Sequence, residues 1–251
     1  VLIHYNYYKT KKIIILNLLF LLTCTIVVFL SGERAPFFYL VFFIVLIFIF
    51  IPKIRTYSLI GVFFSLIIIF GLIQFKPIAK IRMIDYTISQ INESKLPMLP
   101  FSNHHLEHIS SAYKMFLENP VFGNGTNLFS FLCERPQFKI SYLSCSTHPH
   151  NYYLQVLSEL GLVGIFFLLS FFLYCSFMLF KRLGFFPKPN KNFSDNRDFL
   201  LYLILLFVFW WPLIPNMSLY NNWNNVMIML TLGFFLKYFY GYKIYGNLYK
   251  N

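Results

Sequence analysis

The chain is organised around residues 146–180, which read STHPHNYYLQVLSELGLVGIFFLLSFFLYCSFMLF. The part from Leu160 to Phe180 is 21 residues of almost unbroken apolar sequence, enough to cross a hydrocarbon layer as an α-helix. The part before it is polar and holds two histidines, a proline and an asparagine. Because proline is tolerated only in the first turn of a helix, Pro149 predicts that the helix begins near residues 148–150 and that its polar end stands above the membrane.

The composition is that of a membrane protein. Hydrophobic residues make up 58% of the 251 residues, aromatic residues 22% and charged residues only 12%. This is more apolar surface than one soluble core of this length needs, and it indicates a polytopic membrane protein. A net charge of +12 would suggest a nucleic-acid partner in a soluble protein. Here the lysines and arginines lie between apolar runs, so membrane topology explains them and we expect no nucleic acid.

Six apolar runs recur along the chain, and each is about long enough to cross a membrane as a helix. They lie at residues 13–30, 36–51, 57–75, 160–180, 199–214 and 223–240. We therefore expect an all-α, polytopic transmembrane bundle with about six spans. Its parts would be an N-terminal membrane region (1–75, with a short turn at 31–35), a long loop (76–159) and a C-terminal membrane region (160–251).

The distribution of lysine and arginine orients these runs. The two short loops on one side carry only Arg34, and most of the other basic residues outside the long loop lie in the opposite segments, at 1–12, 52–56, 181–198 and 241–251. The more positive side is cytoplasmic. The long loop then faces outward, because loops above roughly 60 residues translocate largely regardless of charge. If that compartment is oxidising, Cys133 and Cys145 in the loop are disulfide candidates.

The middle of the long loop is predicted to be helical. Apolar residues recur there at intervals of three and four, at Leu106, Ile109, Tyr113, Phe116 and Leu117, which gives one apolar face. Asn119-Pro120, followed by Gly123 and Gly125, supplies the stop. His104, His105 and His108 fall near the start of this helix.

Several motifs together resemble one family. Thr147-His148-Pro149-His150-Asn151, followed by Tyr153-Leu154-Gln155, Glu159-Leu160-Gly161 and Gly164, is similar to the signature of the bacterial O-antigen ligase and Wzy-type O-antigen polymerase superfamily. Three further stretches agree in the expected order: Ser31-Gly32-Glu33-Arg34, the loop motif from Asn119 to Gly125, and the late turn from Pro215 to Asn225. The family usually has ten or more spans, and this chain starts at Val1, so we expect an incomplete N-terminus, with an unusual start codon as the alternative.

The resemblance implies transfer of a lipid-linked glycan on the periplasmic face of the bacterial inner membrane, without a nucleotide sugar, a cofactor or a required metal. The implied donor is a saccharide on undecaprenyl diphosphate. The implied acceptor is a sugar hydroxyl on lipid A core or on a growing glycan. Polymerase and ligase use the same donor and differ in the acceptor, so the sequence leaves both open.

The chemistry of the residues fits this reaction. A diphosphate leaving group needs a cation, which Arg34 can supply because guanidinium is always charged and binds phosphate oxygens in pairs. A base that titrates near neutrality helps a sugar hydroxyl to attack, and His150 is suited to that role. We expect Asn151, Glu159 and His105 to contact the substrates. The second cation would be Arg82 or Arg135.

Simpler and competing interpretations stay open. His150 can cap the helix with Asn151, and Arg34 can be an ordinary interfacial side chain. The loop histidines, Glu107 and the two cysteines could instead form a zinc site in a membrane hydrolase, although His105-Leu106-Glu107-His108 does not have the spacing of zinc proteases. A transporter of lipid-linked glycan would need charged residues within the spans, and the six runs contain almost none.

Overall fold

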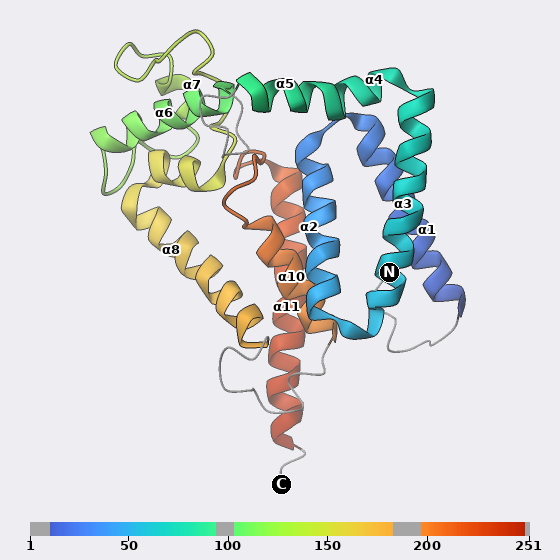
Figure 1. Cartoon of the computed structure of the whole chain (residues 1–251). Helices are drawn as coiled ribbons and strands as arrows, with labels where there is room; N and C mark the ends of the chain where they lie inside the picture. Colours follow the sequence, from blue (N-terminus) through green and yellow to red (C-terminus); the bar gives the residue numbers. More distant parts are fainter. Residues whose placement is uncertain (1–10, 94–102, 183–196, 249–251) are drawn as a thin grey trace. The chain divides into compact units, whose positions relative to one another are not determined.

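The computed structural model in Figure 1 describes residues 11–93, 103–182 and 197–248, and every regular element in these ranges is helical. The α-helices are α1 (Lys11–Ser31), α2 (Arg34–Phe50), α3 (Arg55–Phe75), α4 (Pro77–Lys80), α5 (Tyr86–Glu93), α6 (Asn103–Glu118), α7 (Phe129–Leu132), α8 (Tyr152–Arg182), α10 (Arg197–Phe209) and α11 (Asn222–Leu248). The all-α fold class is therefore confirmed for the described residues. The chain forms two compact units, described separately below.

Two helices are long and apolar enough to cross a membrane, Arg55–Phe75 and Tyr152–Lys181. Only 11% of the apolar window of each is buried within the structure. Such exposed apolar surfaces mark contact with lipid or with another protein. Ile15–Ser31, Arg34–Phe50 and Phe199–Phe209 are shorter apolar helices, so the count of six spans stays a prediction.

The fifth apolar run does not continue as a helix to residue 214. Helix α10 ends at Phe209, because Pro212 lacks a backbone N–H and disfavours helical geometry in the residue before it. Other side chains use the carbonyl groups that this ending leaves free. Tyr153 donates its hydroxyl to the Trp210 carbonyl (2.6 Å), and the Asn151 amide donates to the Pro212 carbonyl (2.7 Å). The predicted length of this span was wrong.

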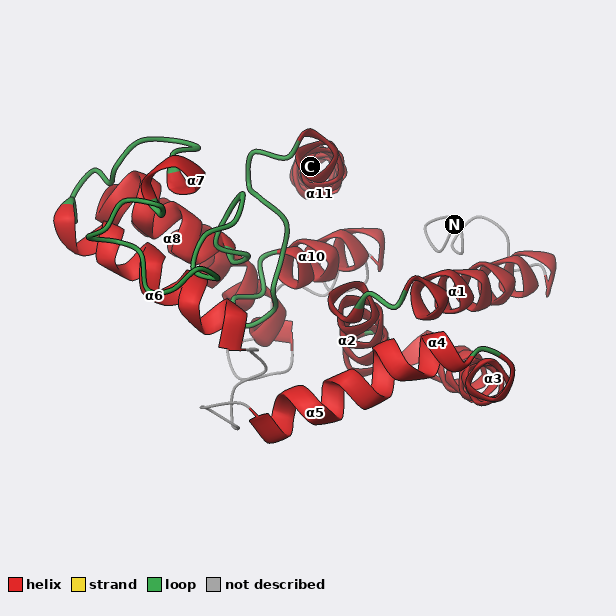
Figure 2. Ribbon diagram, turned by 90° about the horizontal axis from the view of Figure 1, so that it is seen from above, coloured by secondary structure: helices red, strands yellow, loops and turns green. Residues whose placement is uncertain are grey.

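The first unit comprises the chain up to residue 87, residues 177–209 and the chain from residue 231. In it α1, α2 and α3 pack together, and α10 packs against α2. Thr25 of α1 and Ser65 of α3 share a buried hydrogen bond of 3.2 Å. Ala79 and Met83 pack at the end of α1 with Phe29, where Figure 2 shows α4 continuing from the end of α3. This packing brings the segment after α3 to the turn between α1 and α2.

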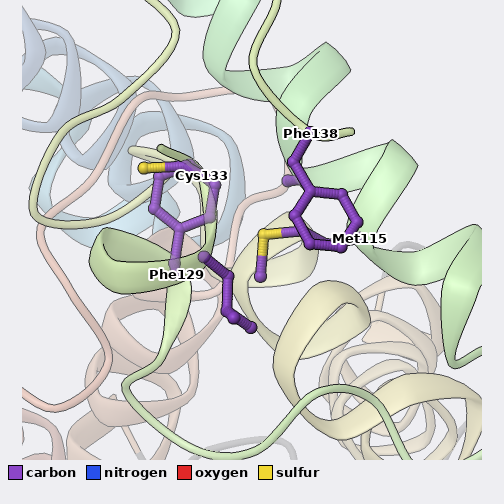
Figure 3. Packing of buried hydrophobic residues seen from close by; sticks show 6 residues of the cluster. Met115, Phe129, Cys133 and Phe138 are labelled. Carbon is purple, nitrogen blue, oxygen red and sulfur yellow. The ribbon is translucent and has the colours of Figure 1, made fainter. Parts of the chain in front are cut away.

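The second unit comprises residues 88–176 and 210–230. Its core joins α6, α7 and the segment after α7 through six buried side chains: Ala112, Met115, Phe129, Leu132, Cys133 and Phe138. Figure 3 shows how Met115, Phe129 and Phe138 meet in this cluster. The predicted loop helix is confirmed as α6, which ends at Glu118 directly before Asn119-Pro120.

Helix α8 breaks at Gly161, which has φ 63° and ψ −156°. Figure 1 shows a short first part and a longer second part that meet at an angle. The loop after α6 pairs with the backbone at this break. Leu162 N–H donates to the Pro120 carbonyl (2.8 Å) and Val163 N–H to the Val121 carbonyl (3.2 Å). The segment from residue 152 to residue 182 is therefore not one straight helix.

Candidate functional site

Four histidines from two parts of the second unit come together. His105 and His108 come from α6, and His148 and His150 from the segment before α8. The ring centroid of His150 lies 4.2 Å from that of His148, 5.5 Å from His108 and 5.6 Å from His105. The structure thus brings the predicted residues His105 and His150 side by side, and it adds two further imidazoles around His150.

The backbone of His150 has an unusual conformation. Its φ is 54°, in the left-handed region that residues other than glycine rarely adopt. Residues held in such backbone conformations cluster at functional sites. Its carbonyl accepts a hydrogen bond of 2.9 Å from Asn216 N–H. Among the described residues, nothing hydrogen-bonds to its ring nitrogens. The main chain of His150 is therefore fixed while its ring nitrogens stay available to a ligand.

The predicted residue Asn151 caps α8. Its side-chain oxygen accepts hydrogen bonds from Tyr153 N–H (2.9 Å) and Leu154 N–H (3.2 Å), the arrangement of a helix N-cap. Its amide nitrogen donates to the Pro212 carbonyl. The side chain is buried. Asn151 thus fixes the start of the helix directly after His150, and a contact between Asn151 and substrate stays a prediction.

Hydrogen bonds fix the tautomers of two neighbouring rings. His148 Nε2 lies 3.2 Å from the Asn216 carbonyl and therefore carries the proton, which leaves Nδ1 to accept from the Thr147 hydroxyl (2.9 Å). His108 Nδ1 lies 3.1 Å from the Ser144 carbonyl, so Nδ1 carries a proton. Both nitrogens of His148 are engaged, which suits a supporting role.

Burial lowers the pKa of His150 to about 4, and repulsion from His148, His105 and His108 adds to this effect. Burial also lowers the pKa of His148, although the Asn216 carbonyl opposes the change. At neutral pH His150 is therefore uncharged. An uncharged, half-buried imidazole with no hydrogen bond to its ring can accept a proton from a hydroxyl group.

In the first unit, Arg82 lies against the turn that precedes Arg34. Arg34 is the first residue of α2, directly after Gly32 and Glu33. Arg82 Nη2 lies 3.4 Å from the Glu33 carboxylate. A Cβ atom on Gly32, which has φ 69°, would lie 2.7 Å from Arg82 Nε. Of the two candidates for a second cation, Arg82 therefore lies against the turn before Arg34, and Arg135 is an exposed residue after α7 in the second unit.

Glu159 is buried in the second unit, with 1% of its surface exposed. One carboxylate oxygen accepts a hydrogen bond from Asn127 N–H and the other from Phe129 N–H, each 3.0 Å long. A carboxylate with both oxygens engaged in this way holds the loop before α7. The structure thus gives Glu159 a role inside the protein, and its predicted contact with substrate is untested.

Cys133 and Cys145 form a disulfide, with their Cα atoms 5.4 Å apart. It joins the end of α7 to the residue after Ser144, whose carbonyl accepts from His108. Among the described residues no group of three histidine, cysteine, aspartate or glutamate side chains is placed to hold a metal ion. The disulfide removes both loop cysteines from any such set, so the zinc interpretation has no geometry to support it there.

All the site residues described above, except those in the segment 210–216, lie in the part of the chain that one family model matches. The sequence model of the O-antigen ligase family matches residues 19–169, more than half of the chain. The chain belongs to the O-antigen ligase family. The resemblance noted in the motifs is thereby confirmed at the level of the family.

A curated relative agrees with this assignment to the O-antigen ligase family. A protein of Rickettsia bellii (strain RML369-C), which carries the provisional name polysaccharide ligase, is 27% identical over 166 residues. The aligned part is 64% of this chain and 37% of the relative, so the chain spans little more than a third of that protein's length. No solved structure matches the chain.

Sequence reasoning gave two residues of this histidine cluster too little weight. His108 was considered only as a metal ligand, although its position three residues after His105 places both on one helix face. Asn216 lies in the late turn that resembles the family, but nothing in the sequence indicated that its N–H and carbonyl would bind His150 and His148.

Proposed function

We propose that the protein transfers a saccharide from undecaprenyl diphosphate to a sugar hydroxyl on the periplasmic face of the bacterial inner membrane. The acceptor is lipid A core or a growing glycan. Membership of the O-antigen ligase family and the two long apolar helices support this proposal. The single observation that carries it is the uncharged, half-buried ring of His150 on a fixed, left-handed backbone.

In the proposed reaction His150 is the general base. The acceptor oxygen attacks the anomeric carbon while the imidazole takes the hydroxyl proton. The bond between the anomeric carbon and the phosphate oxygen breaks, and undecaprenyl diphosphate leaves with the electron pair. Arg34 and Arg82 neutralise the negative charge of the diphosphate. The net change is one glycosidic bond formed, one phosphate ester bond broken and one proton moved to His150.

The long loop is placed in the periplasm by this proposal, with the chain crossing the membrane several times. The support is the scarcity of lysine and arginine in the short loops on the same side. Both lipid-linked substrates are then reached from the outer leaflet.

The test is transfer of a labelled lipid-linked saccharide by membranes that contain His150→Asn protein. Asparagine adopts the left-handed conformation more readily than alanine, so this variant removes the base and keeps the backbone. We expect a loss of about 100-fold or more in transfer, in the range that general-base catalysis supplies. Glu134→Gln is the matched control, because Glu134 forms only an exposed ion pair with Lys139. Wild-type transfer by His150→Asn at equal expression would remove His150 from the mechanism.

A further inference from the structure

The loop between α6 and α7, residues 119–128, attaches α6 to the break in α8. On one side of the break Asn124 N–H donates to the Ser158 carbonyl (3.1 Å) and Gly125 N–H to the Glu159 carbonyl (3.0 Å). On the other side Leu162 N–H and Val163 N–H donate back to the loop. A helix break normally leaves backbone groups unpaired, and here the loop satisfies them.

The side chain of Asn124 connects the two helices directly. Its amide nitrogen donates to the Met115 carbonyl of α6 (2.7 Å) and to the Ser158 carbonyl of α8 (2.9 Å). Its oxygen accepts from the Asn119 amide (2.7 Å). Both amide hydrogens and the oxygen are therefore used, so no other side chain can replace this arrangement without loss.

Glu159 makes a second connection a few residues further along the loop. Its carboxylate accepts from Asn127 N–H and Phe129 N–H. Phe129 is 1% exposed and packs in the cluster with Met115 of α6. The position of Glu159 on α8 is thereby linked, through Phe129, to the position of α6.

The two connections act on the histidines. His108 lies seven residues before Met115 on α6, about 10 Å along the helix axis. A small rotation of α6 about Met115 would thus move His105 and His108 away from His150. We propose that Asn124 and Glu159 are positioning residues that hold α6 against α8, so that the α6 histidines stay packed against His150. This assignment rests on the proposed function of His150, and it replaces direct substrate contact as the role of Glu159.

The titration of His150 reports the packing independently of activity. The titratable groups that act on its ring are His148 on its own segment and His105 and His108 on α6. From residues 210–216 it receives the N–H of Asn216, and that segment contains no titratable side chain. If α6 moves away, His150 gains solvent and loses two repelling neighbours, so its pKa rises towards the ordinary value.

The experiment compares Asn124→Asp and Glu159→Gln with Glu134→Gln in the purified full chain. Aspartate at 124 would place an oxygen against the Met115 and Ser158 carbonyls, and glutamine at 159 would point an N–H at one of the two loop N–H donors. Histidine labelled with ¹³C at Cε1 is titrated by NMR, with His150→Asn to assign the signal. Transfer is measured over pH, with kcat and KM determined separately.

We expect both variants to raise the pKa of His150 by about one unit or more. We also expect kcat to fall by about 10- to 100-fold, with KM changed much less, because a misplaced neighbour affects the reacting geometry. Asn124→Ala removes the bridge without repulsion, and it provides the same test if Asn124→Asp does not fold.

Folded variants with a wild-type titration of His150 would overturn the positioning role, whatever their activity. A shifted titration in the variants, with full transfer by His150→Asn, would support the positioning role and refute the proposed function. The two proposals therefore fail separately.

Discussion

Gly161→Ala tests the docking of the loop on α8 most directly. Gly161 has φ 63° and ψ −156°, a region that is essentially restricted to glycine and costs another residue about 1–3 kcal/mol. The added Cβ would lie 2.5 Å from the Val121 carbonyl oxygen, so the loop must move. The hydrogen bonds from Leu162 and Val163 would be lost, at about 1 kcal/mol each. The expected destabilisation of the second unit is therefore about 3–5 kcal/mol.

Cys175 provides the assay. It is a free cysteine of the second unit with no exposed surface, so a thiol reagent reaches it only when the unit opens. Cys24 is the other free cysteine, and a Cys24→Ser background removes its signal. Labelling of Cys175 across a denaturant series then measures the stability of Gly161→Ala and of wild type. Gly71→Ala is the control, because a Cβ there has no atom within 4 Å and alanine favours a helix by about 0.5–1 kcal/mol over glycine.

The result that would refute the reasoning is a wild-type labelling curve for Gly161→Ala. The break in α8 would then not depend on glycine, and the loop would not be held there. If Gly71→Ala lost as much stability as Gly161→Ala, any added methyl group would be destabilising. The backbone conformation of Gly161 would then not explain the effect.

The remaining predictions concern pH and the arginine turn. The transfer rate should stay constant from pH 8 to about pH 6 and fall at lower pH with an apparent pKa near 4, because His150 must be uncharged to act as a base. A fall in the rate with an apparent pKa near the ordinary value of about 6.5 would contradict the argument that burial lowers the pKa of His150. His105→Gln removes one repelling imidazole and should move this limb to higher pH. Gly32→Ala should displace the Arg82 guanidinium and raise KM for the lipid-linked donor about tenfold, in the range of one charge-assisted hydrogen bond. An unchanged KM would show that Arg82 does not bind the donor.

The pH dependence also has a consequence for stability. The pKa of His150 is about 4 in the folded protein and about 6.5 in an unfolded chain. Between these values the unfolded state binds more protons, so the stability of the second unit falls as the pH drops from about 6.5 towards 4. Acid therefore lowers both the fraction of free base and the stability of the fold.

The sequence predicted the features that depend on neighbours along the chain. Apolar runs gave the long helices, and the three- and four-residue spacing gave α6 with its end at Glu118. The family motifs gave the O-antigen ligase assignment. Each of these signals is local, because helix periodicity, proline and glycine stops act within a few residues.

Features that depend on distant partners could not be predicted in the same way. Glu159 was expected to contact the substrates, but its carboxylate accepts from Asn127 and Phe129, which lie 32 and 30 residues away. The early end of α10 depends in part on Asn151 and Tyr153, which take the freed carbonyls. No periodicity connects such positions, so a sequence pattern alone gives the wrong surroundings for them.

The conformation of His150 shows why these distant contacts matter for the proposed chemistry. A left-handed backbone at a histidine costs energy, and it persists only where the surroundings determine it. Asn216 N–H binds the His150 carbonyl, and the next residue, Asn151, is fixed by its cap on α8 and by the Pro212 carbonyl. All of these contacts involve the main chain or the neighbouring residue, and none uses a ring nitrogen of His150. These contacts fix the position of the imidazole and leave its nitrogens open, which is the combination that a general base needs.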